Sequence, residues 1–215
     1  MKRLRFASVM PVVAALVIAA SGDPACAGML TGSASLDTSG LSGPFEIALV
    51  FTDGSGTGDA NNTVTLSNFL FGGGSAGSVD ASLSFGGQSG DLVSGVVLVD
   101  SFFLNVFASS FTPGSALSFN FDLTTNVDAG GTPDQFSFAL LHADGTVVNT
   151  ADPSGANSLL TVNLDSAHPA ISTFVSDLTP APVVVESGGV PEPSSGALLA
   201  VGLAALWLRR PQRRQ

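Results

Sequence analysis

Residues 117–124 of this 215-residue chain read LSFNFDLT, with an apolar side chain at every second position. A period of two is typical of a β-strand that buries one of its faces. Residues 45–52, FEIALVFT, follow the same rule with Phe, Ile, Leu and Phe at the alternate positions. These two segments predict strands that share one apolar core.

Other segments extend this pattern along the chain. Shorter alternating runs occupy residues 64–66, 69–71, 79–85, 136–140 and 160–164. Residues 96–99 and 102–107 are apolar almost throughout, as expected of central strands covered on both faces. Gly-rich turns separate the runs, and no sustained helical stripe interrupts them. We therefore predict an all-β fold, an antiparallel β-sandwich of jelly-roll type with about nine or ten strands.

Charge is segregated along the chain. All 7 basic residues lie at its ends: Lys2, Arg3, Arg5, Arg209, Arg210, Arg213 and Arg214. All but two of the 17 carboxylates lie within residues 28–189. A body of this kind repels polyanions, so we expect no nucleic-acid partner.

The N-terminal residues have the features of an export signal. A basic start is followed by an apolar run over residues 9–20, which is too short to span a bilayer comfortably. Small residues then flank Cys26 at Ala25 and Ala27, which fits a signal-peptidase site. We predict a cleaved signal peptide over 1–27 rather than an N-terminal anchor. Cleavage would remove the single cysteine, so the mature body must hold together without disulfides.

The remaining chain divides into three parts. Residues 28–178 are predicted to form the sandwich, called the passenger domain below. Residues 179–189 are rich in Pro and Gly, which is typical of a solvated linker. Residues 190–215 form a separate C-terminal segment.

The C-terminal segment combines three features in a fixed order. Pro191, Glu192 and Pro193 precede an apolar run over residues 196–208, and the basic cluster Arg209, Arg210, Arg213 and Arg214 follows. As a helix the run would reach about 20 Å, against a hydrocarbon core of about 30 Å. Snorkelling arginine side chains make a short transmembrane helix feasible. Because basic residues stay on the cytoplasmic side, the passenger would lie outside.

This order resembles the PEP-CTERM sorting signal of Gram-negative bacteria. The resemblance implies export across the inner membrane by signal peptidase, then recognition of Pro191, Glu192 and Pro193 by an exosortase in a membrane-anchored intermediate. It also implies an association with exopolysaccharide or biofilm. The passenger is similar to PEP-CTERM proteins of unassigned activity at residues 36–45, 111–115 and 122–126, and this likeness implies no catalytic residue.

The passenger offers little for catalysis. His142 and His168 are expected in turns or loops, and no Gly-x-Ser-x-Gly elbow precedes a helix. Glycan-active clefts usually present Trp or Tyr, but the chain has no Tyr and its single Trp207 lies in the tail. Polar outward positions such as Asn105, Asn120 and Asp122 still leave a glycan-binding or glycan-processing module as an alternative.

No cofactor is expected from the sequence, and a calcium ion is the one alternative that the residues leave open. Asp53, Ser55, Thr57 and Asp59 space oxygen atoms along a Gly-rich loop, which suits a hard cation with six to eight oxygen ligands. Asp and Gly are also common in ordinary turns, so a loop without a metal explains the same residues. A calcium-dependent adhesion module therefore remains open.

Together these observations predict a non-enzymatic protein of the cell surface or extracellular matrix. Its role would be structural or adhesive, with exopolysaccharide as the candidate partner.

Overall fold

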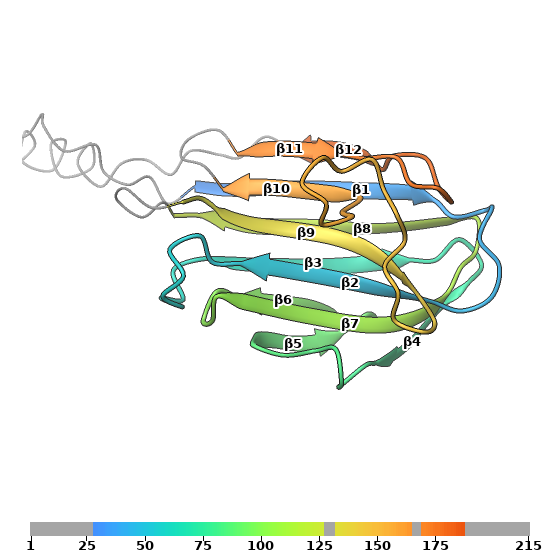
Figure 1. Ribbon diagram of the computed structural model, residues 1–215, viewed down its shortest axis with the longest axis horizontal. Coiled ribbons are helices and arrows are strands. Elements are labelled where there is room, and N and C mark those ends of the chain that lie inside the picture. The colour runs from blue at the N-terminus through green and yellow to red at the C-terminus, as the bar shows by residue number, and fades with distance from the viewer. Residues whose placement is uncertain (1–27, 127–131, 165–168, 188–215) are drawn as a thin grey trace, which may run out of the picture.

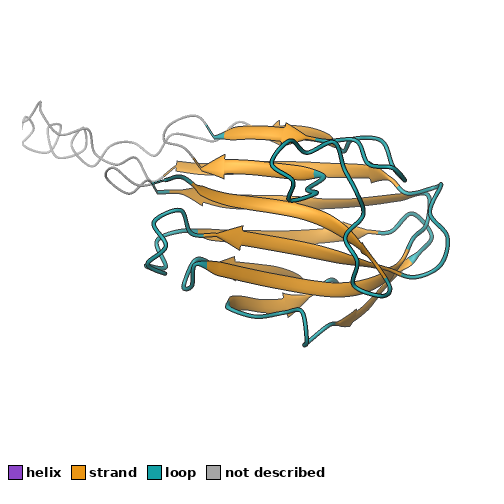
Figure 2. Ribbon diagram, viewed as in Figure 1, coloured by secondary structure: helices purple, strands orange, loops and turns teal. Residues whose placement is uncertain are grey.

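The computed structural model describes residues 28–126, 132–164 and 169–187, which form two six-stranded sheets and contain no helix (Figures 1 and 2). In spatial order the first sheet consists of β12 (Val183–Ser187), β1 (Gly28–Asp37), β8 (Ala116–Thr125), β3 (Thr63–Leu70), β6 (Gly95–Val99) and β5 (Gly87–Asp91). The second consists of β11 (Ala170–Thr173), β10 (Leu160–Leu164), β9 (Asp134–His142), β2 (Phe45–Thr52), β7 (Leu104–Thr112) and β4 (Ser75–Val79). All strand pairs are antiparallel, so the predicted all-β, two-sheet class is confirmed.

The strand order alternates between the sheets. The central strands β1, β8, β3 and β6 form one layer, and β2, β7 and β4 form part of the other. Strands β9, β10 and β11 then extend the second sheet consecutively. The jelly-roll type stays a prediction.

The core comes from the alternation seen in the sequence. In β8, Leu117, Phe119, Phe121 and Leu123 are buried, whereas Asn120 between them is exposed. Strand β2 buries its own alternate residues in the same core cluster, because a pleated strand sends successive side chains to opposite faces. The strands predicted over 45–52 and 117–124 are confirmed.

The strand predicted over residues 79–85 is wrong. Strand β4 ends at Val79, and the Asp80 carboxylate then accepts hydrogen bonds from the backbone N–H groups of Ser82 and Leu83. These hydrogen bonds hold the backbone in a turn and end the strand. Phe85 afterwards makes a single bridge to Val106.

The central strand predicted over residues 102–107 also begins too early. Phe102 and Phe103 lie in a loop and are each 60% exposed, and β7 starts at Leu104. The side chain of Asn105 donates to the Phe102 carbonyl at 2.7 Å, which closes a turn where the apolar run suggested a strand.

Two predicted runs, 64–66 and 69–71, instead share one strand. Strand β3 continues from Thr63 to Leu70, with a register shift between Ser67 and Leu70. Asn68 has a φ of 54° there. A bulge with a left-handed residue breaks the alternation without ending the strand.

Part of the predicted linker over 179–189 is a strand. Val183–Ser187 forms β12 and pairs with β1, with Ser187 opposite Thr31. Val184 packs against the core. Pro182 lies just before β12, where a missing N–H group is tolerated.

The described body begins and ends on one side of the sandwich. Gly28 pairs with Thr125, and Ser187 lies opposite Thr31. The connections over 53–62 and 100–103, together with Asn126, Thr132 and Pro133, lie at this end, which we call the loop end (Figure 1). The predicted signal peptide and C-terminal helix lie outside the described residues.

Candidate functional site

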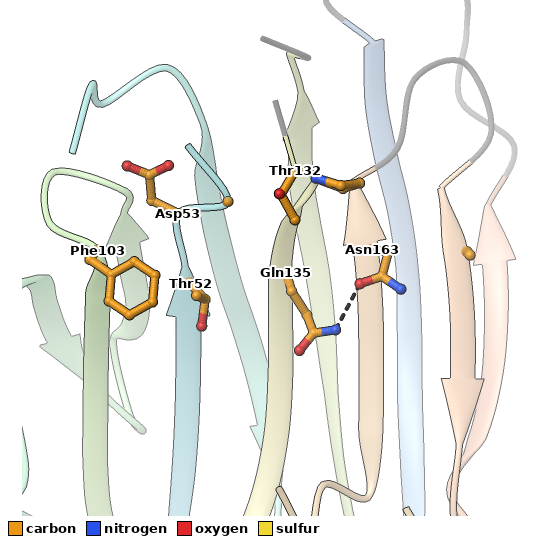
Figure 3. Close-up of a pocket in the computed structure, with 9 residues that line it drawn as sticks. Thr52, Asp53, Phe103, Thr132, Gln135 and Asn163 are labelled. Carbon is orange, nitrogen blue, oxygen red and sulfur yellow. Dashed lines mark hydrogen bonds between the residues drawn. The ribbon is translucent and has the colours of Figure 1, made fainter. Parts of the chain in front are cut away.

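A hollow of about 670 Å³ lies on the outer face of the second sheet at the loop end (Figure 3). Its lining residues include Thr52, Asp53, Phe103, Thr132, Gln135 and Asn163. Figure 3 shows the Phe103 ring on one side and the amides of Gln135 and Asn163 on the other.

Strand register brings these polar groups together. Thr52 of β2 lies opposite Gln135 of β9, which lies opposite Asn163 of β10. Gln135 Nε2 donates to Asn163 Oδ1 at 2.7 Å. Each of the three alternates with core-facing neighbours, so all three present polar atoms to the outer face. The hollow therefore has a floor of hydroxyl and amide groups beside one exposed aromatic ring.

The carboxylate in this lining, Asp53, is engaged by its own loop. Its Oδ1 accepts from Ser55 N and Ser55 Oγ at 2.7 Å and from Gly56 N at 3.0 Å, and its Oδ2 accepts from Gly58 N. Burial acts to raise the pKa of Asp53, but these hydrogen bonds outweigh it and lower the pKa. Asp53 is thus a structural cap of the loop in its ionised form.

The predicted calcium residues are only partly brought together. Ser55 Oγ lies 2.8 Å from Thr57 Oγ1 and donates to Asp53, whereas the carboxylate of Asp59 accepts from the backbone and side chain of Asn61. Within the described residues, no three His, Cys, Asp or Glu side chains form a metal-binding group. Calcium at this loop stays a prediction.

His142 does not line the hollow. His142 ends β9 and packs against Phe45, with ring centroids 5.5 Å apart, and its N–H donates to the Thr146 carbonyl. His142 is therefore the last residue of a strand and lies next to the turn at Asp144 and Gly145, not in the turn itself. His168 lies outside the described residues.

The three polar residues predicted to face outward separate into two groups. Asn120 is exposed and Asp122 half-buried on β8. Asn105 is instead fully buried, because its side chain donates to Phe102 and Phe51 carbonyls and accepts from Gly87 N. The prediction that Asn105 faces outward was wrong. A polar side chain can occupy an inward-facing strand position when all its hydrogen-bonding groups have partners.

Sequence reasoning missed a second polar cluster at the loop end. Asp100, Asp134 and Asn62 are buried there, at 0%, 7% and 0% exposure. Burial raises the pKa of Asp100 to about 7. The neighbouring carboxylate of Asp134 also raises this pKa, whereas a hydrogen bond from Asn62 lowers it. No spacing in the chain signals this cluster, because its members come from three separate connections.

The similarity of this chain to known proteins lies in its C-terminal tail. The PEP-CTERM protein-sorting motif matches residues 189–214, which confirms the motif predicted from the sequence. The match supports an exosortase-substrate PEP-CTERM protein that is exported and processed through a membrane-anchored intermediate. The passenger domain remains unassigned, since no curated protein and no solved structure matches the chain.

The sorting residues Pro191, Glu192 and Pro193 and the cluster Arg209, Arg210, Arg213 and Arg214 lie outside the described residues. Among residues 28–126, 132–164 and 169–187, no helix is long and apolar enough to cross a membrane.

Proposed function

We propose that this protein is an exported component of the cell surface or extracellular matrix of a Gram-negative bacterium, with a structural or adhesive role and no enzymatic activity. The observation that carries the proposal is the matched sorting motif at residues 189–214, two residues after the last strand of the sandwich. A folded body joined so closely to a sorting tail is cargo for that system.

The chemistry of the body supports this role. Residues 28–126, 132–164 and 169–187 contain carboxylates but no Lys or Arg. Carboxylates such as Asp37, Asp80, Asp91 and Asp144 cap turns by accepting local hydrogen bonds. The domain is therefore highly charged, and hydrogen bonds from neighbouring residues satisfy these turn carboxylates. A high net charge favours solubility outside the cell.

The hollow favours a second candidate function, glycan binding. Phe103 offers an exposed ring, and Thr52, Gln135 and Asn163 offer hydroxyl and amide groups that hydrogen-bond sugar hydroxyls. The negative charge of the body disfavours uronic acids and other acidic chains. We therefore place neutral segments of exopolysaccharide at this hollow.

The sorting proposal is tested in an exporting host with the full chain. Exchanging both Pro191 and Pro193 for Ala is expected to stop tail processing, so that the unprocessed chain accumulates in the membrane fraction. Exchanging Pro180 for Ala is the control, because this proline lies outside the matched residues. A double variant with the same mature mass and location as the parent would contradict the proposal.

A further inference from the structure

Three connections of the loop end bring two carboxylates together inside the protein. Asp100 follows β6, Asp134 begins β9, and Asn62 precedes β3. Asn62 joins the two acids: its backbone N–H donates to Asp100 Oδ2 at 3.0 Å, and its Nδ2 donates to Asp134 Oδ2 at 2.7 Å. The Asp134 carboxylate also accepts from Gly54 N at 2.8 Å.

Asn62 is held firmly in this bridging position. Its Nδ2 also donates to the Asn126 carbonyl at 2.8 Å, and its Oδ1 accepts from Asn126 N and Thr124 Oγ1. All four hydrogen-bonding positions of the amide are therefore used. Asn62 therefore fixes both carboxylates, Asp100 through its backbone N–H and Asp134 through its side chain, but it carries no charge that could neutralise them.

One oxygen of the pair has no partner. Asp100 is fully buried, and among the described residues its Oδ1 atom meets no hydrogen-bond donor. It lies beside the Asp134 carboxylate, and Asp59 is close enough to act on Asp100 through its charge. A buried carboxylate oxygen without a donor is costly, so the fold leaves an unmet demand for positive charge at this point.

The described part of the chain contains no side chain that meets this demand. Its ranges include no Lys or Arg, and His142 ends the strand that Asp134 begins. At about 3.3 Å per residue, the length of β9 separates His142 from Asp134 by roughly 26 Å. A compensating positive charge must come from solution, either as a proton on Asp100, whose pKa is raised to about 7, or as a bound metal ion.

We propose that a calcium ion binds between the Asp100 and Asp134 carboxylates, with Asp100 Oδ1 as a ligand. Calcium prefers carboxylate and carbonyl oxygens and accepts irregular, flexible loop geometry, whereas magnesium demands a near-ideal octahedron. Two protein carboxylates, supplemented by waters, give a weak site of the kind found in extracellular modules, with a dissociation constant of about 10⁻⁴–10⁻³ M. This site differs from the 53–59 loop suggested by the sequence.

Thermal unfolding of the processed protein, stripped with a chelator and titrated with calcium chloride, tests the proposal. Calcium at ten times its dissociation constant is expected to raise Tm by about 3–6 °C. Asp100→Asn should abolish this rise, and Asp122→Asn, a matched control on β8, should retain it. Calorimetric titration of the parent protein should show binding in the same range.

Three outcomes would overturn the proposal. The first is a parent protein that shows neither heat nor a Tm shift at about ten-millimolar calcium, well above the expected constant. The second is an undiminished shift in Asp100→Asn. The third is a shift that Thr57→Ala removes while Asp100→Asn keeps it, because that result places the ion in the 53–59 loop. If Asp100→Asn does not fold, Asp134→Asn takes its place with the same expected result.

Discussion

Phe119 of β8 and Phe138 of β9 meet edge to face across the two sheets, with ring centroids 5.4 Å apart and an interplanar angle of 79°. Phe119 also lies 5.4 Å from the ring of Phe69. Edge-to-face pairs add to the free energy of burial, so this contact ties one sheet to the other at the centre of the core.

Replacing Phe119 with Ala is expected to lower the free energy of unfolding by about 3–5 kcal/mol, because it removes a buried ring and leaves a cavity between the sheets. Urea unfolding of the processed protein measures the change. Phe102→Ala is the control: this side chain is 60% exposed, so we expect a change within about 0.5 kcal/mol. Equal losses in the two variants would contradict the cross-sheet role of Phe119.

Phe103→Ala is expected to weaken binding of neutral exopolysaccharide about tenfold, the loss of about 1.4 kcal/mol of stacking and burial. Affinity electrophoresis in gels containing the polysaccharide gives the ratio. Phe102→Ala is matched to it in type and exposure but does not line the hollow, so its affinity should stay at the parental value. Similar affinities for all three proteins would remove the hollow as the binding site.

Glu46→Gln should stabilise the protein increasingly as pH rises. Burial and then the charge of Asp80 raise the pKa of Glu46, and its Oε2 is buried with no hydrogen-bond partner among the described residues. A raised pKa means that the folded protein favours the protonated form of Glu46. The contribution of Glu46 to stability is therefore fully present below its pKa in the unfolded chain, about 4.3, and is lost as pH rises through its pKa in the folded protein.

The difference in Tm between Glu46→Gln and the parent is therefore expected to become more positive between pH 4 and pH 7. Comparing both proteins at each pH cancels the opposite trend of the turn-capping aspartates. Asn120→Gln, a change on the exposed face of β8, is a control that should show no such trend. A Tm difference that stays constant between pH 4 and pH 7 would show that ionised Glu46 does not destabilise the fold.

Gly54→Ala should disturb the loop end. A Cβ atom at this position would lie against the backbone oxygens of Thr132 and Pro133, and the Gly54 N–H also holds Asp134. We expect a loss of about 1–3 kcal/mol in the free energy of unfolding. Gly40→Ala, whose added Cβ meets its nearest atom at 3.8 Å, should change stability by about 0.5 kcal/mol at most. Chemical unfolding of both variants tests this difference.

Alternation within one strand was sufficient to predict the core, because it depends only on neighbouring side chains. Residues 117–124 and 45–52 therefore became β8 and β2 as expected. Local pattern failed where a polar side chain reached across a turn. Asn105 captures the Phe102 carbonyl, and Asp80 caps the turn after β4, so two apolar runs were interrupted.

The loop-end cluster was beyond local pattern for a different reason. Asn62 and Asp100 are 38 residues apart, and Asn62 and Asp134 are 72 apart. Their meeting depends on which strands become neighbours, and the order of strands follows from the whole set of pairings. The row formed by Thr52, Gln135 and Asn163 depends on the same register. In the tail, by contrast, the order of the residues is itself the signal, and the sorting motif was predicted correctly.

Strand β12 ends at Ser187, and the matched motif begins at residue 189. Any scission inside the motif therefore spares the hydrogen bonds between β12 and β1. Loss of the tail therefore leaves the sandwich folded. It also exposes no new unpaired strand edge on which other copies of the protein could aggregate.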